Sequence, residues 1–355
     1  MKNFFYGVIE GFYGRQWSWQ QRIDYAKFAH QFNFECYIYA PKGDPLLRTQ
    51  WREQYDAHTF SQLKNLRDVY RQHGIQWGLG ISPMGINAGL TVADLNDLTT
   101  KIEQLNTLDV DILCILFDDM EGAHDDLAAN QLAVVELIQS VSNADHHIVC
   151  PSYYSFDPKL ETVFGKMPEH YLSDLGQGLA ADIDIFWTGN KVITEQYTEN
   201  DLLRITHIVG RKPIIWDNYP VNDGKITSQY LHLSPYQGRP WELSRWSAGH
   251  IVNPMNQSHL SQLVLSTLFE LYTDKAHYSP ADAWEKSLQG IGNDALANLL
   301  RHDASGFQSA GLDKLAEEDK RRKLAQYRAI QHPIAREVAD WLAGDYAFDP
   351  NCLTD

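Results

Sequence analysis

Two adjacent carboxylates follow a short, wholly apolar run in the sequence. Residues 113–117 read Leu-Cys-Ile-Leu-Phe, and Asp118 and Asp119 come directly after them. An uninterrupted apolar run of this length is typical of a buried parallel strand. Two carboxylates placed together repel each other, so their presence at the end of such a strand indicates that both are used. The structural alternative is a solvated cap between strand and loop.

The adjacency of Asp118 and Asp119 restricts the chemistry. A glycosidase with two catalytic carboxylates needs them ~5 to 5.5 Å apart if retaining and ~6.5 to 9.5 Å apart if inverting, on either side of the scissile bond. Side chains in a strand alternate faces, so neighbours reach one ligand only where regular geometry ends, and then from the same side. This arrangement suits substrate assistance, in which a 2-acetamido group attacks its own anomeric carbon. One Asp then orients the amide and the other protonates the leaving oxygen.

The rest of the chain alternates between strand-like and helix-like patterns. Eight apolar or β-branched runs are separated by stretches with helical periodicity, such as Leu63, Leu66, Val69 and Tyr70. Continuous apolar strands that alternate with helices predict a parallel sheet covered on both faces. The runs are 4–9, 34–40, 76–81, 112–117, 147–150, 183–187, 213–216 and 250–252.

Eight such units in roughly 270 residues favour an α/β fold of the (β/α)₈ TIM-barrel type over an open doubly wound sheet. A nucleotide-binding sheet requires a phosphate-binding glycine turn. Gly7, Gly11 and Gly14 have the spacing GxxxGxxG instead of GxGxxG, and no Walker sequence is present. We therefore expect a barrel.

The carboxyl ends of the eight predicted strands carry polar and aromatic residues. Barrel enzymes place their active sites at these ends, so the pattern is a test that depends on no motif. A lysine, several carboxylates, two asparagines and several aromatic rings predict an enzyme that acts on a neutral, polyhydroxylated substrate. The ends read Glu10-Gly11-Phe12-Tyr13, Pro41-Lys42-Gly43-Asp44, Ser82-Pro83, Asp118-Asp119, Ser152-Tyr153-Tyr154, Thr188-Gly189-Asn190, Asp217-Asn218-Tyr219 and Asn253-Pro254.

Composition excludes several classes of protein. A net charge of −16 argues against nucleic acid as a partner and makes a polyanionic substrate unfavourable. The cysteines show no CxxC spacing, and three of the four fall inside apolar runs, so we expect small buried thiols in a reducing compartment. The apolar stretch at the N-terminus is too short for a signal peptide and is broken by Glu10. We predict an unprocessed cytoplasmic protein without a membrane segment.

The sequence divides into a predicted catalytic barrel, residues 1–278, and a helical appendage, residues 279–355. Ser279-Pro280 has the form of a helix start, and helical character continues to about Leu300. A second helical stretch begins at Leu312 and carries a charged run, and we expect Pro333 to kink or end it. The appendage would pack on the barrel or on a partner subunit, which leaves a homodimer open.

Several motifs are shared with one enzyme family. They are Gly7-Val8-Ile9-Glu10-Gly11-Phe12-Tyr13-Gly14-Arg15, Tyr39-Ala40-Pro41-Lys42, Trp51-Arg52-Glu53-Gln54-Tyr55, Leu116-Phe117-Asp118-Asp119, Trp187-Thr188-Gly189 and Trp216-Asp217-Asn218. In this order and over roughly residues 4–275, they resemble the family 84 glycoside hydrolases. These are the O-GlcNAcases and related β-N-acetylglucosaminidases, some of which are called hyaluronidases. The (β/α)₈ fold of that family agrees with the strand pattern.

The resemblance implies a role for each matched residue. Asp118 would hold and polarise the acetamido N–H, and Asp119 would be the general acid and then the general base, with a raised pKa while its proton is needed. Tyr154 would bond the acetamido oxygen or the leaving group, and Trp216 would wall the acetamido methyl. The remaining candidates would line the pocket or hold sugar hydroxyls: the Gly11 carbonyl, Lys42, Thr188, Asn218, Asp223 and Asn253. No cofactor or metal is implied.

The chain departs from the family pattern beside the expected pocket. Gln16 stands where the family often has Pro, Gly43 where it often has Asp, and Tyr153 where an acidic residue often precedes the site tyrosine. The appendage is also shorter than a long helical stalk, so a peptide-binding cleft would be missing or formed only by a dimer. These differences bear on the leaving group more than on the reaction.

Three alternatives to exo-acting removal of terminal β-GlcNAc remain open at this point. One is an endo-hexosaminidase that cuts within a glycosaminoglycan, which the acidic composition disfavours. Another is a sugar-binding protein without activity, against which the intact aspartate pair argues. The last is a metal-dependent hydrolase, suggested by the oxygen-rich run Asp118, Asp119, Glu121, His124, Asp125 and Asp126, whose spacing matches no EF-hand.

Overall fold

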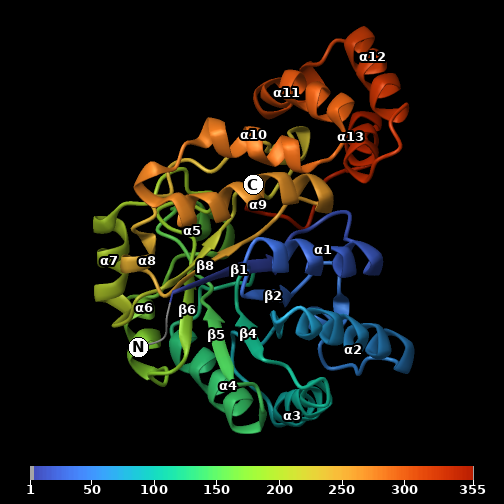
Figure 1. The fold of residues 1–355 in the computed structure, drawn as a ribbon. Coiled ribbons are helices and arrows are strands. Elements are labelled where there is room, and N and C mark those ends of the chain that lie inside the picture. Colours follow the sequence, from blue (N-terminus) through green and yellow to red (C-terminus); the bar gives the residue numbers. More distant parts are fainter. Residues whose placement is uncertain (1–3, 355) are drawn as a thin grey trace.

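The computed structural model describes residues 4–354. Eight parallel strands form a closed barrel in sequence order, with β8 pairing back to β1, and helices surround it (Figure 1). The predicted (β/α)₈ barrel is therefore confirmed. Among the described residues, no helix is both long and apolar enough to cross a membrane.

Each strand lies within one or two residues of the run that predicted it. The strands are β1 (Phe5–Glu10), β2 (Cys36–Tyr39), β3 (Gln76–Ile81), β4 (Ile112–Leu116), β5 (His146–Cys150), β6 (Asp184–Trp187), β7 (Ile214–Asp217) and β8 (Gly249–Val252). Because helices cover the outside of the barrel and side chains fill its inside, strands such as β2, β4 and β8 are buried at every position.

Helices connect the strands and are started by local polar side chains. In α1, the Ser18 hydroxyl accepts from the Gln21 backbone N–H, and the Gln21 side chain accepts from the Ser18 backbone N–H, which is a capping box. The helices up to β8 are α1 (Trp19–Gln31), α2 (Ala57–Gln72), α3 (Val92–Asn106), α4 (Leu127–Val141), α5 (Lys159–Phe164), α6 (Tyr171–Gly178), α7 (Glu199–Val209) and α8 (Leu243–Trp246), and α9 (Ser258–Asp274) follows β8.

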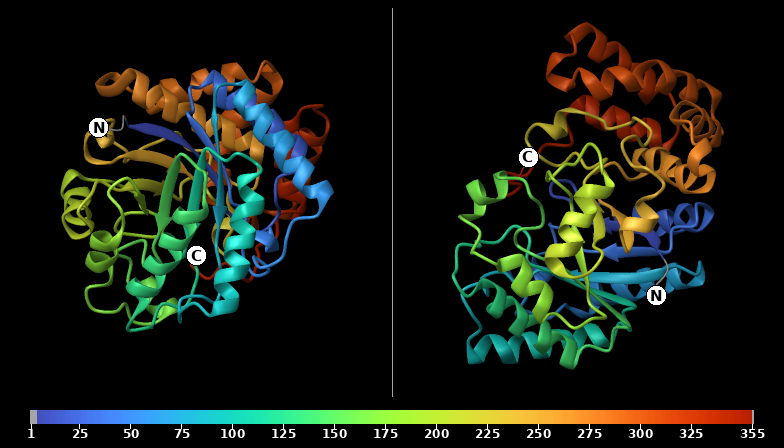
Figure 2. Two further views of the ribbon diagram at one scale, coloured as in Figure 1. Left: turned by 90° about the horizontal axis from the view of Figure 1, so that it is seen from below. Right: turned by 90° about the vertical axis from the view of Figure 1, so that its left-hand side faces the viewer.

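The appendage consists of α10 (Pro280–Gly290), α11 (Asp294–Ser309), α12 (Glu317–Arg328) and α13 (Pro333–Ala343). Ser279 caps α10 as predicted, but the helical stretch to about Leu300 is two helices, broken where Gly292 has a positive φ of 70°. Pro333 lies at the first position of α13, so it starts a helix after α12 has ended. Helices α10 and α13 both pack on α9 (Figures 1 and 2). The division at residue 278 stays a prediction.

A buried ion pair joins the end of β1 to α1. Arg22 donates to Glu10 through Nε and Nη2 at 2.8 and 2.6 Å, and the Tyr37 hydroxyl also donates to Glu10. Glu10 is fully buried. The pair fixes the direction in which the chain leaves β1 toward Gly11.

A second buried network fixes the end of β7. Arg239 donates to both Asp217 carboxylate oxygens, at 2.8 and 2.9 Å, and His250 Nε2 lies 3.0 Å from the same carboxylate. All three side chains are buried. Asp217 points away from the residues that precede and follow it, which agrees with its omission from the candidate site residues.

Replacement of Asp217 by Asn is expected to lower the free energy of unfolding by about 3–5 kcal/mol, because it leaves the buried Arg239 guanidinium without its carboxylate. Urea denaturation measures the change. The matched control is Glu285→Gln, which breaks the exposed pair with Arg301 and should leave the midpoint unchanged. Equal effects for the two variants would show that the buried pair contributes no more to the free energy of unfolding than the exposed pair does.

Candidate active site

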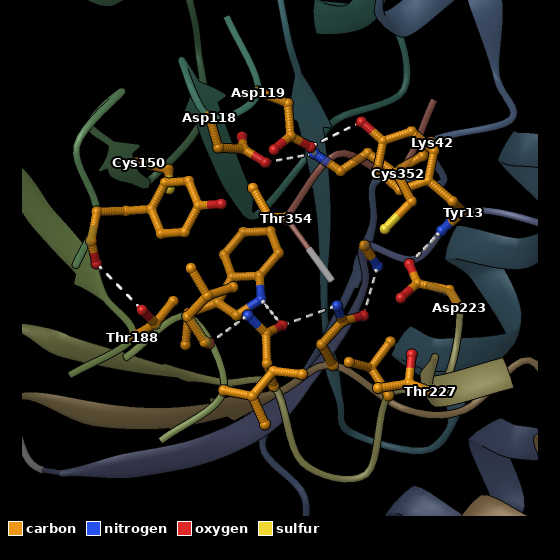
Figure 3. Close-up of a pocket in the computed structure, with 18 residues that line it drawn as sticks. Tyr13, Lys42, Asp118, Asp119, Cys150, Thr188, Asp223, Thr227, Cys352 and Thr354 are labelled. Atoms are coloured by element: carbon orange, nitrogen blue, oxygen red, sulfur yellow. Dashed lines mark hydrogen bonds and ion pairs between the residues drawn. The ribbon is translucent and has the colours of Figure 1, made fainter. Parts of the chain in front are cut away.

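A cavity opens at the carboxyl ends of the strands (Figure 3). All ten residues that the sequence proposed as site residues line this one cavity. They are Gly11, Lys42, Asp118, Asp119, Tyr154, Thr188, Trp216, Asn218, Asp223 and Asn253. Their individual roles remain proposals, but their convergence is a property of the fold.

The aspartate pair faces the cavity because the strand ends just before it. Strand β4 stops at Leu116, and Asp119 has a left-handed backbone with φ of 60°. Aspartate tolerates this region better than most residues, and the change of backbone direction cancels the alternation of side chains. Both carboxylates therefore line one cavity, with side chains 8% and 9% exposed.

Lys42 is the cation that holds the two carboxylates together. Its ammonium group donates to Asp118 and lies 3.2 Å from Asp119 Oδ2. Burial lowers the pKa of Lys42, but the two aspartates outweigh it, so the pKa is raised and the lysine stays charged. The other Asp118 oxygen, Oδ1, is buried and accepts no hydrogen bond from the described residues. It is the acceptor that a substrate N–H could fill.

The same Asp119 oxygen accepts a second contact. The Tyr13 hydroxyl donates to Asp119 Oδ2 at 2.7 Å, and Arg48 Nη2 donates to the Tyr13 oxygen at 2.9 Å. Burial raises the pKa of Asp119, but Lys42, the Tyr13 hydrogen bond and Arg48 together lower it below its ordinary value. The expectation of a raised pKa for the general acid is thus wrong for this structure, because the cations crowd the carboxylate.

Trp216, Asn218, Asn253 and Gly11 form a connected wall opposite the aspartates. Trp216 Nε1 donates to Asn218 Oδ1 at 2.9 Å, and Asn253 Nδ2 donates to the same oxygen at 3.1 Å. The Gly11 backbone N–H donates to Asn253 Oδ1 at 3.2 Å. A Cβ atom at Gly11 would stand 2.6 Å from the Trp216 ring, so only glycine allows the ring to lie there.

Tyr154 and Thr188 complete the enclosure from β5 and β6. The Thr188 hydroxyl lies 3.3 Å from the Tyr154 carbonyl oxygen and 3.0 Å from the Lys191 carbonyl oxygen. It therefore braces the backbone behind the tyrosine. Burial raises the pKa of Tyr154, so its hydroxyl stays protonated and can donate into the cavity.

One family of known proteins matches most of the chain. A sequence model of the β-N-acetylglucosaminidase family matches residues 6–302. The chain belongs to the family 84 glycoside hydrolases. It is 29% identical to the rat protein O-GlcNAcase over 287 residues, which are 76% of this chain and 30% of the relative. The chain thus matches about a third of the length of that relative.

Solved structures agree with this assignment. A mutant form of the Thermobaculum terrenum O-GlcNAc hydrolase matches 97% of this chain and 82% of its own, with 29% identity and a TM-score of 0.78. A structure named CpGH84B, 24% identical, matches with a TM-score of 0.75 over 96% of this chain and 66% of its own, and it supports the fold. This family 84 chain therefore has the barrel that its sequence predicted.

The candidate site of this family 84 chain also contains residues that the sequence did not single out. Tyr13 is the most important of them, since it contacts Asp119. Tyr13 belongs to the first of the polar and aromatic strand ends in the sequence, so its position could have identified it as a site residue. Cys352 and Thr354 had no such signal, because they come from the far end of the appendage. The other additions are Cys150, Val192, Ile193, Val221 and Thr227. Among residues 4–354, no group of three or more His, Cys, Asp or Glu side chains is placed so that it could hold a metal ion.

Asp223 is a strongly perturbed carboxyl in the candidate site. It accepts from the Tyr13 backbone N–H at 2.6 Å, and burial nonetheless raises its pKa to about 7, with a smaller contribution from the Asp119 charge. It is the residue of this site whose charge changes near neutral pH.

Replacement of Asp223 by Asn is expected to stabilise the protein at pH 8 and leave stability unchanged at pH 4. In the folded protein Asp223 holds its proton up to about pH 7, whereas in the unfolded chain it loses the proton near its ordinary pKa of 3.8. The free energy of unfolding of the parent therefore falls as the pH rises from about 4 through 7. The gain at pH 8 should reach up to about 4 kcal/mol. Thermal unfolding at the two pH values measures it, and a variant less stable than the parent at pH 8 would contradict the assignment.

Proposed function

We propose that the protein is a retaining exo-β-N-acetylglucosaminidase that uses the acetamido group of its substrate as the nucleophile. The observation that carries the proposal is the same-side placement of Asp118 and Asp119, which line one cavity from adjacent positions. Such a pair does not straddle a glycosidic bond as two-carboxylate mechanisms require. A substrate that brings its own nucleophile removes that requirement.

In the first step, Asp118 accepts the acetamido N–H through its unpartnered oxygen and orients the amide. The carbonyl oxygen attacks the anomeric carbon, the glycosidic bond breaks, and Asp119 gives its proton to the leaving oxygen. The product is a cyclic oxazolinium ion, whose positive charge the Asp118 carboxylate stabilises. In the second step, Asp119 takes a proton from water as that water attacks the anomeric carbon. Two inversions give net retention.

Asp119 must carry a proton for the first step, although the surrounding cations lower its pKa. Substrate binding offers a way to supply it. A sugar hydroxyl that draws Lys42 away from the carboxylates would weaken the cation's hold on Asp119 and raise its pKa. Tyr13, fixed as a donor by Arg48, would keep the acid pointed at the leaving oxygen.

The other side chains would bind the sugar. Trp216 offers an apolar face for the acetamido methyl, and Tyr154 offers a hydroxyl donor for the acetamido oxygen or the leaving group. The sugar hydroxyls would meet the Gly11 carbonyl, Lys42, Asn218, Asp223 and Asn253, with Thr188 behind Tyr154.

O-GlcNAc-modified protein is the leaving-group class that we propose, since relatives named O-GlcNAcase and O-GlcNAc hydrolase share this barrel. An endo-hexosaminidase acting on a glycosaminoglycan is the alternative, and the net charge of −16 opposes a polyanionic chain. We also propose a cytoplasmic location, because Cys36, Cys114 and Cys150 are buried free thiols.

Turnover of 4-nitrophenyl β-N-acetylglucosaminide tests the activity, and NMR of the first-formed sugar tests retention. A thiazoline that mimics the cyclised acetamido group should bind far more tightly than GlcNAc itself. A panel that presents the same GlcNAc on protein, chitooligosaccharide and muropeptide then ranks the leaving groups. A covalent sugar adduct trapped on an enzyme carboxylate would overturn the mechanism, and internal cleavage of a defined oligosaccharide would overturn the exo assignment.

A further inference from the structure

The end of the appendage enters the catalytic cavity. After α13 ends, residues 345–354 run back across the barrel mouth, and Cys352 and Thr354 line the same cavity as Asp118 and Asp119. Figure 3 shows Thr354 among the aspartates and the aromatic rings, and Figure 1 places this terminus over the barrel. A segment more than 200 residues away in sequence thus occupies space where a sugar would bind.

The base of this segment is fastened to the loop that carries Gly11 and Tyr13. Tyr346 is buried at 7% exposure, and the Arg15 guanidinium lies 4.6 Å from the centre of its ring. The Ala347 carbonyl oxygen packs on Gly14, where a Cβ atom would stand 3.5 Å away. The segment therefore starts from a defined point beside the pocket.

A turn then directs the chain inward. The Cys352 backbone N–H donates to the Asp349 carbonyl oxygen at 3.0 Å, and the Asn351 backbone N–H donates to the Asp349 side chain at 2.9 Å. Aspartate at the first position, with Pro350 at the second, is a favoured sequence for such a turn. The sequence therefore encodes the change of direction that brings Thr354 to the cavity.

Inside the cavity, Thr354 lies among the groups that the substrate would need. It lines the same cavity as Tyr154, Asp118 and Asp119. Tyr154 is the proposed donor to the acetamido oxygen or leaving group. Because Thr354 and a bound sugar would both lie in this cavity, the two would overlap in space.

We propose that residues 349–354 are an intramolecular ligand of the sugar pocket, which the substrate must displace. The identity of the competing sugar rests on the proposed function, whereas the docking of the segment does not. The contact is small enough to be reversible, since Cys352 and Thr354 line the cavity whereas Leu353 between them is 54% exposed.

A short tether gives the segment an effective concentration of roughly 1 mM. If the segment fills the pocket about nine-tenths of the time, the apparent KM is raised about tenfold, and the free peptide should bind with a Kd of about 0.1 mM.

Kinetics of a chain that stops after Phe348 test the competition. KM should fall about tenfold and kcat should stay within about twofold, because the segment blocks binding without touching the chemistry. A synthetic peptide of residues 345–355 should then inhibit the shortened enzyme competitively. The matched control is Leu353→Ala, which alters an exposed side chain of the segment and should leave KM unchanged. An unchanged KM in the shortened enzyme would overturn the proposal.

Alkylation of Cys352 tests the docking without any turnover. Cys352 is half-buried at the cavity, whereas the other cysteines are buried and serve as an internal check on folding. Arg15→Ala removes the contact with Tyr346 that anchors the segment and should speed the alkylation of Cys352 several-fold, and Cys352→Ser should take up no label. An equal rate in the parent and in Arg15→Ala would refute docking. If the alkylation rates differ as expected but no β-GlcNAc substrate is cleaved, the proposed function is wrong and the docking of the segment is still supported.

Discussion

Replacement of Asp119 by Asn is expected to lower kcat/KM by about 10²–10⁴ for substrates with a poor leaving group, such as a serine or threonine hydroxyl. The loss should be much smaller for 4-nitrophenol, which departs without protonation. The reason is that the amide of the variant would fill the same place beside Tyr13 but could not transfer a proton. Steady-state kinetics with the two leaving groups, in parallel, measure the difference.

The second step of the reaction gives this variant a further signature. Hydrolysis of the oxazoline also needs Asp119 as a base, so a good leaving group should restore the first step and expose the second as rate-limiting. Thermal unfolding is the control, since the substitution also removes the 3.2 Å ion pair with Lys42. Equal losses for both leaving groups, in a folded variant, would show that Asp119 is not the acid.

Replacement of Asp118 by Asn is expected to produce the opposite pattern, a loss of about 10²–10³ that is the same for both leaving groups. Asp118 acts on the nucleophile, and the variant amide can neither balance the charge of the oxazoline nor hold the acetamido N–H as strongly. Protonation of the leaving oxygen by Asp119 is untouched, so the quality of that group should not matter. The ratio of kcat/KM for the two leaving groups measures this directly.

A thiazoline inhibitor separates the two aspartates independently of turnover. Its affinity should fall strongly for Asp118→Asn, because Asp118 faces the cyclised group, and should fall less for Asp119→Asn. The control is again thermal unfolding, since Asp118→Asn leaves Lys42 with a weaker partner in a buried site. A preserved thiazoline affinity in a folded Asp118→Asn variant would contradict substrate assistance.

Local sequence patterns were enough to specify the barrel and the region of the site. Alternation of apolar runs with helical periodicity specifies strands buried on both faces, and this signal is local, so all eight strands lie close to their predicted positions. The carboxyl ends of parallel strands meet at one rim, which is why polar strand ends identified the lining of the cavity without any contact information. Eight of the ten proposed residues belong to these strand ends, whereas Trp216 and Asp223 were implied by the family resemblance.

The interactions among those residues, in contrast, depend on the folded chain. The positive φ of Asp119, the capture of both aspartates by Lys42, and the contact of Tyr13 with Asp119 involve side chains that are distant in sequence. The lowered pKa of Asp119 follows from these cations, and periodicity carries no information about them. Pro333 likewise could stop one helix or start another, and packing against α9 selected the second.

The segment that ends at Thr354 is the clearest case of what the sequence left undetermined. The turn at Asp349 and Pro350 is readable locally, but a turn does not say where the chain then goes. Its destination depends on the path of α13 over the barrel and on the anchoring of Tyr346 by Arg15. Local chemistry therefore set the elements and their polar ends, whereas contacts between residues far apart in the chain set the charges, orientations and occupancy of the site.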